Sequence, residues 1–157
     1  MNKYELFLDN AEILNNKFRI IPLLYGSLGL EILTGENLNS DDIDILIPEI
    51  FLSDRWEEFR SYLESINYEL IDLHEHTFLV NDEKISYASV ENLEPFAGIK
   101  IENLNTYRGN DSLYKLLTLR QYLMVYQKSS LDGYRMNKKE KQDNKKIELI
   151  KRKLITY

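Results

Sequence analysis

The chain has 157 residues, a net charge of −6, and 43% hydrophobic and 29% charged residues. A chain of this length can bury a substantial core as one domain, and this balance excludes a wholly disordered protein. It contains no cysteine. The absence of cysteine excludes disulfide-stabilised scaffolds, cysteine-ligated zinc or iron–sulfur centres, and thiol catalysis.

Hydropathy gives no indication of a membrane protein. No apolar run approaches the roughly 18 residues that a membrane-spanning helix needs. The first ten residues, MNKYELFLDN, carry acids within their apolar stretch and do not resemble a signal peptide. We therefore expect a soluble, cytoplasmic protein without a membrane partner.

Charge is distributed unevenly along the chain. Residues 138–153 contain eight basic and three acidic side chains, so the remainder of the chain is strongly acidic. An acidic body disfavours broad, non-specific binding to nucleic acid. The basic segment is either a solvated helix face or a contact for phosphate or RNA, and the sequence leaves both open.

The first part of the chain alternates between helical and extended patterns. Apolar periodicity predicts, in chain order, a helix over 3–16, a strand over 19–25, a turn at Gly26-Ser27, a short helix over 28–34 and a strand over 42–47. Gly35 ends the second helix, and a polar loop separates it from the strand.

The later part predicts a helix, a hairpin and a helical end. The elements are a helix over 53–66 capped by Ser53, strands over 68–73, 77–80, 85–89 and 99–104, a helix over 111–127, and a last helix after Asp132-Gly133. This order predicts an α/β (α+β) fold with a small mixed β-sheet and flanking helices. We expect a core over 1–105, with a C-terminal helical part over 106–157 packed on it.

The strand over 42–47 carries the chemistry. Because side chains alternate along a strand, Asp42 and Asp44 share one face, about 6.5–7 Å apart along the strand. Two neighbouring carboxylates are tolerated in solvent or held together by a divalent cation, and Mg²⁺ favours carboxylate and phosphate oxygens. Gly26 permits close approach of a ligand to the backbone, and Ser27 at a helix N-terminus favours phosphate.

Each of these signals also has a purely structural explanation. Alternating acids and isoleucines are typical of a surface strand with one solvated face, and Gly-Ser is an ordinary turn. Their order is more specific than either alone: a strand, Gly26-Ser27, a helix, a loop, and then Asp42 and Asp44 on a second strand.

In this order, the stretch from Leu23 to Ile47 resembles the core motif of the DNA-polymerase-β-like nucleotidyltransferase superfamily. The resemblance covers about 25 residues clearly, extends loosely to Ser89 and leaves 105–157 uncovered. It implies that Asp42 and Asp44 hold Mg²⁺ and are catalytic. It also implies that Gly26 and Ser27 bind the phosphates of a nucleoside triphosphate such as ATP. A nucleoside monophosphate would then pass to a hydroxyl on a small compound, a tRNA or a protein.

One position departs from the family pattern. Members usually carry a third carboxylate on a later strand, and here the matching position is Ser86. A serine does not replace a carboxylate as a metal ligand or base at neutral pH. Either Asp72, Glu75 or Glu83 substitutes for it, or the chain is a weakly active or inactive nucleotide-binding, antitoxin-like member that regulates a partner protein.

Two other interpretations remain open. His74 and His76 lie two residues apart and would share a strand face, which is compatible with a transition metal but also with an exposed strand. A small α/β interaction protein with an accidental Asp-x-Asp pattern is the third reading of the whole chain. Metal-dependent binding of a nucleoside triphosphate would separate the nucleotide-binding readings from it.

Overall fold

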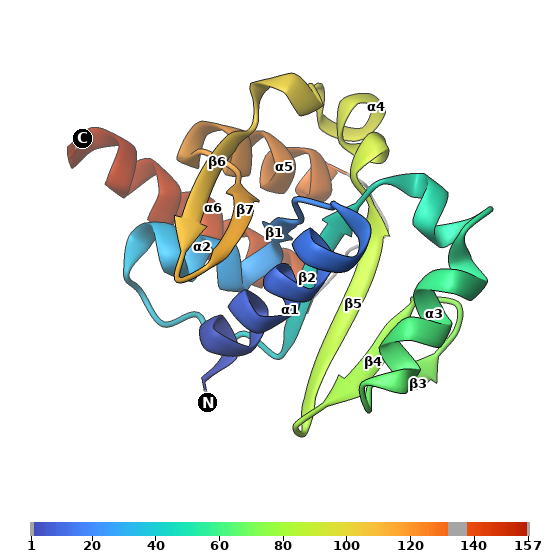
Figure 1. Cartoon of the computed structure of the whole chain (residues 1–157). Helices are drawn as coiled ribbons and strands as arrows, with labels where there is room; N and C mark the ends of the chain where they lie inside the picture. The colour runs from blue at the N-terminus through green and yellow to red at the C-terminus, as the bar shows by residue number, and fades with distance from the viewer. Residues whose placement is uncertain (1, 132–137, 157) are drawn as a thin grey trace.

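The computed structural model describes residues 2–131 and 138–156, and within them seven strands form one mixed sheet (Figure 1). The strand order across the sheet is β3-β4-β5-β2-β1-β7-β6. The strands are β1 (Leu23–Tyr25), β2 (Asp42–Ile47), β3 (Glu69–Asp72), β4 (Thr77–Val80), β5 (Glu83–Ser89), β6 (Asn105–Gly109) and β7 (Ser112–Leu116). This mixed sheet with flanking helices confirms the predicted fold class.

The helices lie on both faces of the sheet. They are α1 (Lys3–Phe18), α2 (Gly26–Thr34), α3 (Trp56–Ser65), α4 (Leu93–Ala97), α5 (Leu119–Leu131) and α6 (Lys138–Thr156). Three 3₁₀ turns of the described part connect them: η1 (Glu49–Leu52), η2 (Val90–Asn92) and η3 (Ile101–Asn103). None of the described helices has the length and apolar composition needed to cross a membrane.

The sheet separates two hydrophobic clusters. One unites α1 and α3 with the odd-numbered isoleucines of β2, Ile43, Ile45 and Ile47, all of which are fully buried. The other contains Leu46 of β2 and buried residues of α2, α4, α5 and α6. Since side chains alternate along β2, Asp42 and Asp44 share the face of Leu46, towards the second cluster.

The N-terminal elements agree with the sequence pattern. The helix over 3–16 corresponds to α1, in which the Asn2 side chain accepts a hydrogen bond from the Glu5 N–H at 2.8 Å. The predicted strand over 42–47 is β2, and the hairpin expected at 81–84 joins β4 to β5. Gly26 and Ser27 are the first two residues of α2 instead of a turn before it.

The C-terminal prediction needs correction. Residues 101–103 form η3 instead of a strand, and Ser112–Leu116 forms β7 instead of a helix. The residues of β7 alternate between buried and half-buried, but the sequence SLYKL shows no matching alternation of polar and apolar residues. The predicted cap also differs, because α3 begins at Trp56 with Arg55 in the cap position instead of Ser53. The break predicted at Asp132-Gly133 lies outside the described residues.

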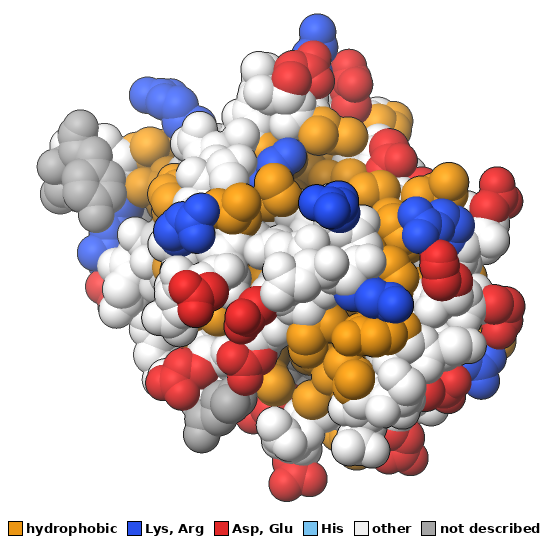
Figure 2. Space-filling view, viewed as in Figure 1, with side chains coloured by type: hydrophobic (Ala, Val, Ile, Leu, Met, Phe, Trp, Pro, Cys, Tyr) orange, Lys and Arg blue, Asp and Glu red, His pale blue; other side chains and the backbone are white. Residues whose placement is uncertain are grey.

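On the face shown in Figure 2, charges of both signs are interspersed. Lys and Arg side chains lie among Asp and Glu side chains and among apolar side chains, without a continuous basic stripe across this view of the described residues. Proteins that bind the backbone of a nucleic acid usually carry such a basic stripe on their surface. In this view the basic side chains of the described residues alternate with acidic ones instead.

Candidate functional site

Asp42 and Asp44 lie beside the start of α2. In the antiparallel pairing of β1 with β2, Asp44 is opposite Tyr25, the residue directly before Gly26. Both carboxylates are half-buried and project from the same face of β2. The pairing therefore brings together all four residues that the motif singled out, Gly26, Ser27, Asp42 and Asp44.

Gly26 and Asp44 approach each other closely. The Gly26 backbone has a φ of +67°, in the left-handed region that favours glycine. A Cβ atom built on Gly26 would lie 2.5 Å from Asp44 Oδ2. No side chain larger than hydrogen fits at residue 26 while Asp44 keeps its position, so the glycine sets how near the carboxylate comes to the helix terminus.

The N-terminus of α2 offers backbone N–H donors. Tyr25 occupies the cap position and makes no side-chain hydrogen bond to the helix. The first N–H groups of an α-helix have no partner within the helix, and the helix dipole makes this end favourable for an anion. Ser27, which is half-buried, adds a hydroxyl at the same place. Together these groups suit a phosphate.

The loop between α2 and β2 is held by Glu31. Its Oε1 accepts hydrogen bonds from the Leu38 N–H at 2.9 Å, the Ser40 N–H at 3.2 Å and the Ser40 hydroxyl at 2.8 Å. These bonds fix the residues that lead directly into the acidic strand. Asp42 and Asp44 are therefore positioned by a bonded loop on one side and by strand pairing on the other.

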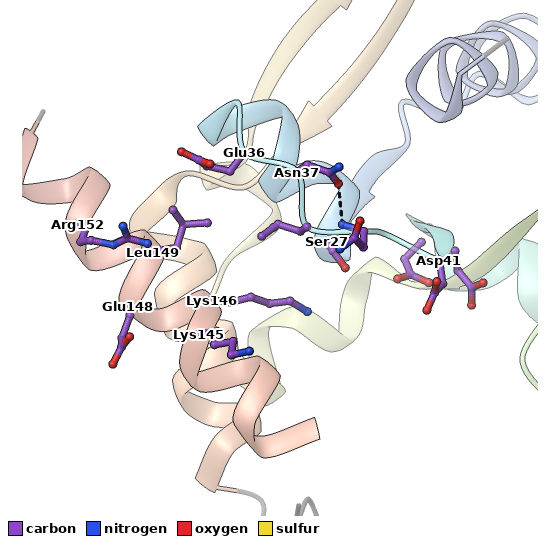
Figure 3. A pocket seen from close by; sticks show the side chains of 13 residues that line it. Ser27, Glu36, Asn37, Asp41, Lys145, Lys146, Glu148, Leu149 and Arg152 are labelled. Carbon is purple, nitrogen blue, oxygen red and sulfur yellow. Dashed lines mark hydrogen bonds between the residues drawn. The ribbon is translucent and has the colours of Figure 1, made fainter. Parts of the chain in front are cut away.

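A cavity of about 770 Å³ opens beside these residues. One wall contains Ser27, Asp41, Asp42 and Asp44, and the opposite wall is formed by α6 through Lys145, Lys146, Glu148, Leu149 and Arg152 (Figure 3). In Figure 3 the Lys146 side chain extends from α6 towards the wall that carries Asp41. Acidic side chains of β2 and the preceding loop thus lie across one cavity from basic side chains of α6.

Asp44 also lines a second cavity, of about 580 Å³. This cavity lies over β5 and contains Ser86, Ala88, His74, Glu75 and His76. In the parallel pairing of β2 with β5, Ser86 is the register partner of Asp44, so both side chains project from the same face of the sheet. The Ser86 hydroxyl is 2.7 Å from that of Thr77 on β4, within hydrogen-bond distance.

The three acids considered as substitutes lie elsewhere or do not complete a triad. Glu83 pairs with Lys3 at 2.9 Å, and Asp72 accepts a hydrogen bond from the Glu75 N–H at 3.1 Å. Glu75 lines the second cavity. Within 2–131 and 138–156, no three His, Asp or Glu side chains are grouped closely enough to share a metal ion. Asp42 and Asp44 therefore stand as a pair.

The donor set of this pair fits Mg²⁺. Mg²⁺ is commonly bound through one or two carboxylates together with water and substrate phosphates, instead of a full cage of protein ligands. Asp42 and Asp44 supply two carboxylates on one face, and the cavity beside them has room for phosphates. His74 and His76 line the second cavity, and they belong to no group of three potential ligands among the described residues.

Tyr122 of α5 lies outside the motif of residues 23–47 but contacts the site. Its hydroxyl donates a hydrogen bond to the Gly26 carbonyl at 2.9 Å, and its side chain is fully buried. A Cβ on Gly29 would clash with this hydroxyl. Gly29 lies three residues after Gly26, on the same helix face, and this spacing was the available signal.

Burial also sets the protonation of Tyr122. Loss of hydration raises the pKa of the Tyr122 phenol well above its usual value, and nearby groups including Tyr126 and Asp44 raise this pKa further. The phenol therefore stays protonated to a higher pH than an exposed tyrosine does. It acts as a permanent hydrogen-bond donor to the Gly26 carbonyl.

Comparison with known proteins gives one sequence relative and two structural neighbours. The chain is 44% identical over 150 residues to the uncharacterized protein YnaI of Bacillus subtilis (strain 168), covering 96% of each chain. No family model matches the chain.

The two solved structures share the fold at low sequence identity. An antigenic nucleotidyltransferase-like protein from Paracoccidioides brasiliensis superposes with a TM-score of 0.64 and 14% identity, over 93% of this chain and 73% of the other. The antibiotic-resistance factor ANT(2'')-Ia superposes with a TM-score of 0.50 and 11% identity, over 99% and 94%. The chain thus belongs to the family of the Bacillus subtilis protein YnaI, and its fold is nucleotidyltransferase-like.

Proposed function

We propose that the chain binds a nucleoside triphosphate such as ATP together with Mg²⁺, and transfers the nucleoside monophosphate to a hydroxyl acceptor. The observation that carries this proposal is the placement of Asp44 against Gly26, at the N-terminus of α2 and beside the 770 Å³ cavity. Three classes of acceptor offer a suitable hydroxyl: small compounds, tRNA and protein side chains.

In this proposal each residue has a defined task. The first N–H groups of α2 and the Ser27 hydroxyl bind phosphate oxygens, and Asp42 and Asp44 would hold Mg²⁺. When bound, Mg²⁺ supplies positive charge that neutralises the reacting phosphates. The chain orients the α-phosphate towards the acceptor, whose oxygen forms the new bond to phosphorus as pyrophosphate leaves.

Ser86 favours a second candidate on the same fold. It occupies the register position beside Asp44 and offers a hydroxyl already close to that of Thr77. In the family pattern the third carboxylate helps to activate the acceptor hydroxyl, and Ser86 supplies none at this position; general-base catalysis is typically worth about 10²–10⁴-fold in rate. The second candidate is a nucleotide-binding regulator with slow or no transfer, acting through a partner protein.

Calorimetric titration with ATP, with and without Mg²⁺, tests the proposal. We expect markedly weaker binding without Mg²⁺ than with it, because two carboxylates repel phosphates until a cation is present. The variant D42N/D44N should lose the Mg²⁺-dependent part, whereas D54N, which changes an exposed acid outside both cavities, should not. Equal titrations with and without Mg²⁺ would contradict the proposal. Release of pyrophosphate separates the transferase from the regulator.

A further inference from the structure

The basic segment 138–153 is the part of the sequence whose role the motif does not explain. Within it, α6 places Lys145, Lys146 and Arg152 on the wall of the 770 Å³ cavity that faces Asp41, Asp42 and Asp44. In Figure 3 the three cations lie on α6 and Asp41 lies across the cavity from them. A ligand in this cavity meets both signs of charge.

The contacts of α6 fix this arrangement. Ser129 of α5 donates a hydrogen bond to Asp143 at 3.1 Å, and the Lys146 ammonium lies 5.1 Å from the centre of the Tyr126 ring. At the other end of the helix, Lys153 pairs with Glu36 at 3.5 Å. Glu36 lines the cavity and belongs to the loop between α2 and β2, so α6 is joined to α5 and to the loop beside the acidic wall.

A ligand that suits this cavity is strongly anionic where it faces α6 and can bind a divalent cation where it faces the aspartates. Lysine and arginine are the usual partners of phosphate groups, as a point charge and as a planar fork of donors respectively. The N-terminal N–H groups of α2 open onto the same cavity through Ser27. A chain of two or three phosphates carries more negative charge than a single phosphate and offers oxygens to several cations at once.

We propose that Lys145, Lys146 and Arg152 form a binding site for the polyphosphate part of a ligand, either a nucleoside triphosphate or pyrophosphate. This inference rests on the proposed function for the identity of the nucleotide, but not for the anion site itself. The three cations place positive charge beside the cavity in a chain whose net charge is −6. They allow an anion to approach a wall that carries three aspartates.

The observations favour a polyphosphate over RNA. An RNA backbone is contacted by a basic groove or stripe over several nucleotides, and three cations confined to one cavity do not form one. The opposite wall of the same cavity is acidic and would repel an extended backbone. A short, dense anion fits this arrangement better than a long one.

Titration with inorganic triphosphate in the absence of Mg²⁺ tests the inference. The variant K145Q/K146Q/R152Q should bind about tenfold or more weakly than the wild type, because charge-assisted contacts to phosphate are lost. The control K100Q/R120Q/K128Q removes two lysines and one arginine that are exposed and lie outside the cavity, so it matches the change in net charge. It should change affinity by less than about twofold, since exposed charges at a distance are screened by salt.

Two further variants separate charge from folding and from the proposed function. K146R keeps the positive charge and should therefore retain binding. If residue 146 acted through packing alone, replacement by arginine would weaken binding as replacement by glutamine does. D42N/D44N should bind triphosphate without Mg²⁺ at least as tightly as the wild type, while losing Mg²⁺-dependent binding of ATP. If the wild type never binds ATP with Mg²⁺ but the cations still govern triphosphate binding, the proposed function fails and the anion site stands.

Three results would overturn the inference. The first is equal binding of triphosphate by the cavity variant and its control. The second is no binding of triphosphate or pyrophosphate by the wild type. The third is preferential binding of a single-stranded RNA that strengthens with RNA length and depends on these cations. Comparison of ATP, pyrophosphate and triphosphate in the same assay identifies which source of polyphosphate the site prefers.

Discussion

The Tyr122 hydroxyl donates a hydrogen bond to the Gly26 carbonyl at 2.9 Å, across 96 residues of sequence. Tyr122 is fully buried on α5, and Tyr126 stacks on it with ring centres 5.9 Å apart. The Gly26 carbonyl, which Tyr122 holds in place, belongs to the residue whose missing side chain lets Asp44 lie close to the N-terminus of α2. The geometry of the candidate site is therefore set in part by a helix that the sequence motif does not include.

Replacing Tyr122 by phenylalanine should separate this hydrogen bond from packing. The variant Y122F keeps the ring and leaves the Gly26 carbonyl without its donor. We expect a loss of about 1 kcal/mol in the free energy of unfolding, as is usual for a single hydrogen bond. We also expect weaker Mg²⁺-dependent binding of ATP, because the turn at Gly26 is less well fixed. Urea unfolding and calorimetry measure the two effects.

The control for this change is Y107F. Tyr107 is 37% exposed on β6 and stacks on Tyr114, away from Gly26. It should change neither stability nor ATP binding by a measurable amount. If Y122F binds ATP as the wild type does, Tyr122 has no influence on the site.

Gly26→Ala tests the close approach of Asp44. Alanine at φ +67° costs about 1–2 kcal/mol by itself, and its Cβ would lie 2.5 Å from Asp44 Oδ2. Gly35→Ala is a matched control, because Gly35 has a φ of +74° and no atom within 4 Å of its added Cβ. We expect G26A to be destabilised more than G35A in thermal unfolding and to lose Mg²⁺-dependent ATP binding.

A double variant identifies the cause of the extra loss. In G26A/D44A the carboxylate that opposes the new Cβ is gone, so stability should recover to about that of G35A. A double variant as unstable as G26A would show that the strain does not come from Asp44.

Ser86→Asp should restore a third carboxylate beside Asp44. In the absence of Mg²⁺ the added charge should lower the melting temperature, because like charges on neighbouring strands repel. Mg²⁺ should raise the melting temperature of S86D more than that of the wild type, since ligands that bind only the folded state stabilise it. Under the proposed function, pyrophosphate release should also increase.

Ala88→Asp provides the comparison for this prediction. Ala88 lies two residues further along β5, lines the same cavity and is opposite Leu46 instead of Asp44. It adds the same charge to the same strand face without placing it beside Asp44. An equal response of A88D and S86D to Mg²⁺ would contradict the special role of position 86.

Alkaline pH should destabilise the chain through its buried tyrosines. Burial raises the pKa of Tyr87 and of Tyr122 well above the usual tyrosine value. Below about pH 10, where unfolded tyrosine remains protonated, their contribution to stability is constant. Above this pH the unfolded chain loses protons that the folded chain retains, so the free energy of unfolding should fall.

Urea unfolding between pH 7 and pH 11 measures this loss. The variant Y122F removes one of the titrating groups, so its stability should fall less steeply above pH 10 than that of the wild type. A parallel decline in both proteins would show that Tyr122 does not contribute to the alkaline transition.

Local patterns in the sequence were sufficient for the centre of the sheet. The alternation of aspartate and isoleucine over 42–47 predicted β2 and the shared face of Asp42 and Asp44, because strand geometry forces side chains to alternate. Thr77–Val80 and the hairpin to β5 were predicted for the same reason. These features depend on neighbouring residues alone, and the resemblance of 23–47 to a nucleotidyltransferase motif agrees with the observed fold.

Contacts between distant residues decided the rest. Ser112–Leu116 became a strand because it pairs with β1 and β6, and no local pattern reveals a partner 90 residues away. The bond from Tyr122 to Gly26 and the position of α6 across from Asp42 likewise arise from packing of α5 and α6 on the sheet. The sequence by itself determined which residues share a strand face. The tertiary structure decided which helices and which cations face these residues. Local patterns do not distinguish between alternative ways of packing α5 and α6 on the sheet, and the burial of apolar surface selects one of them.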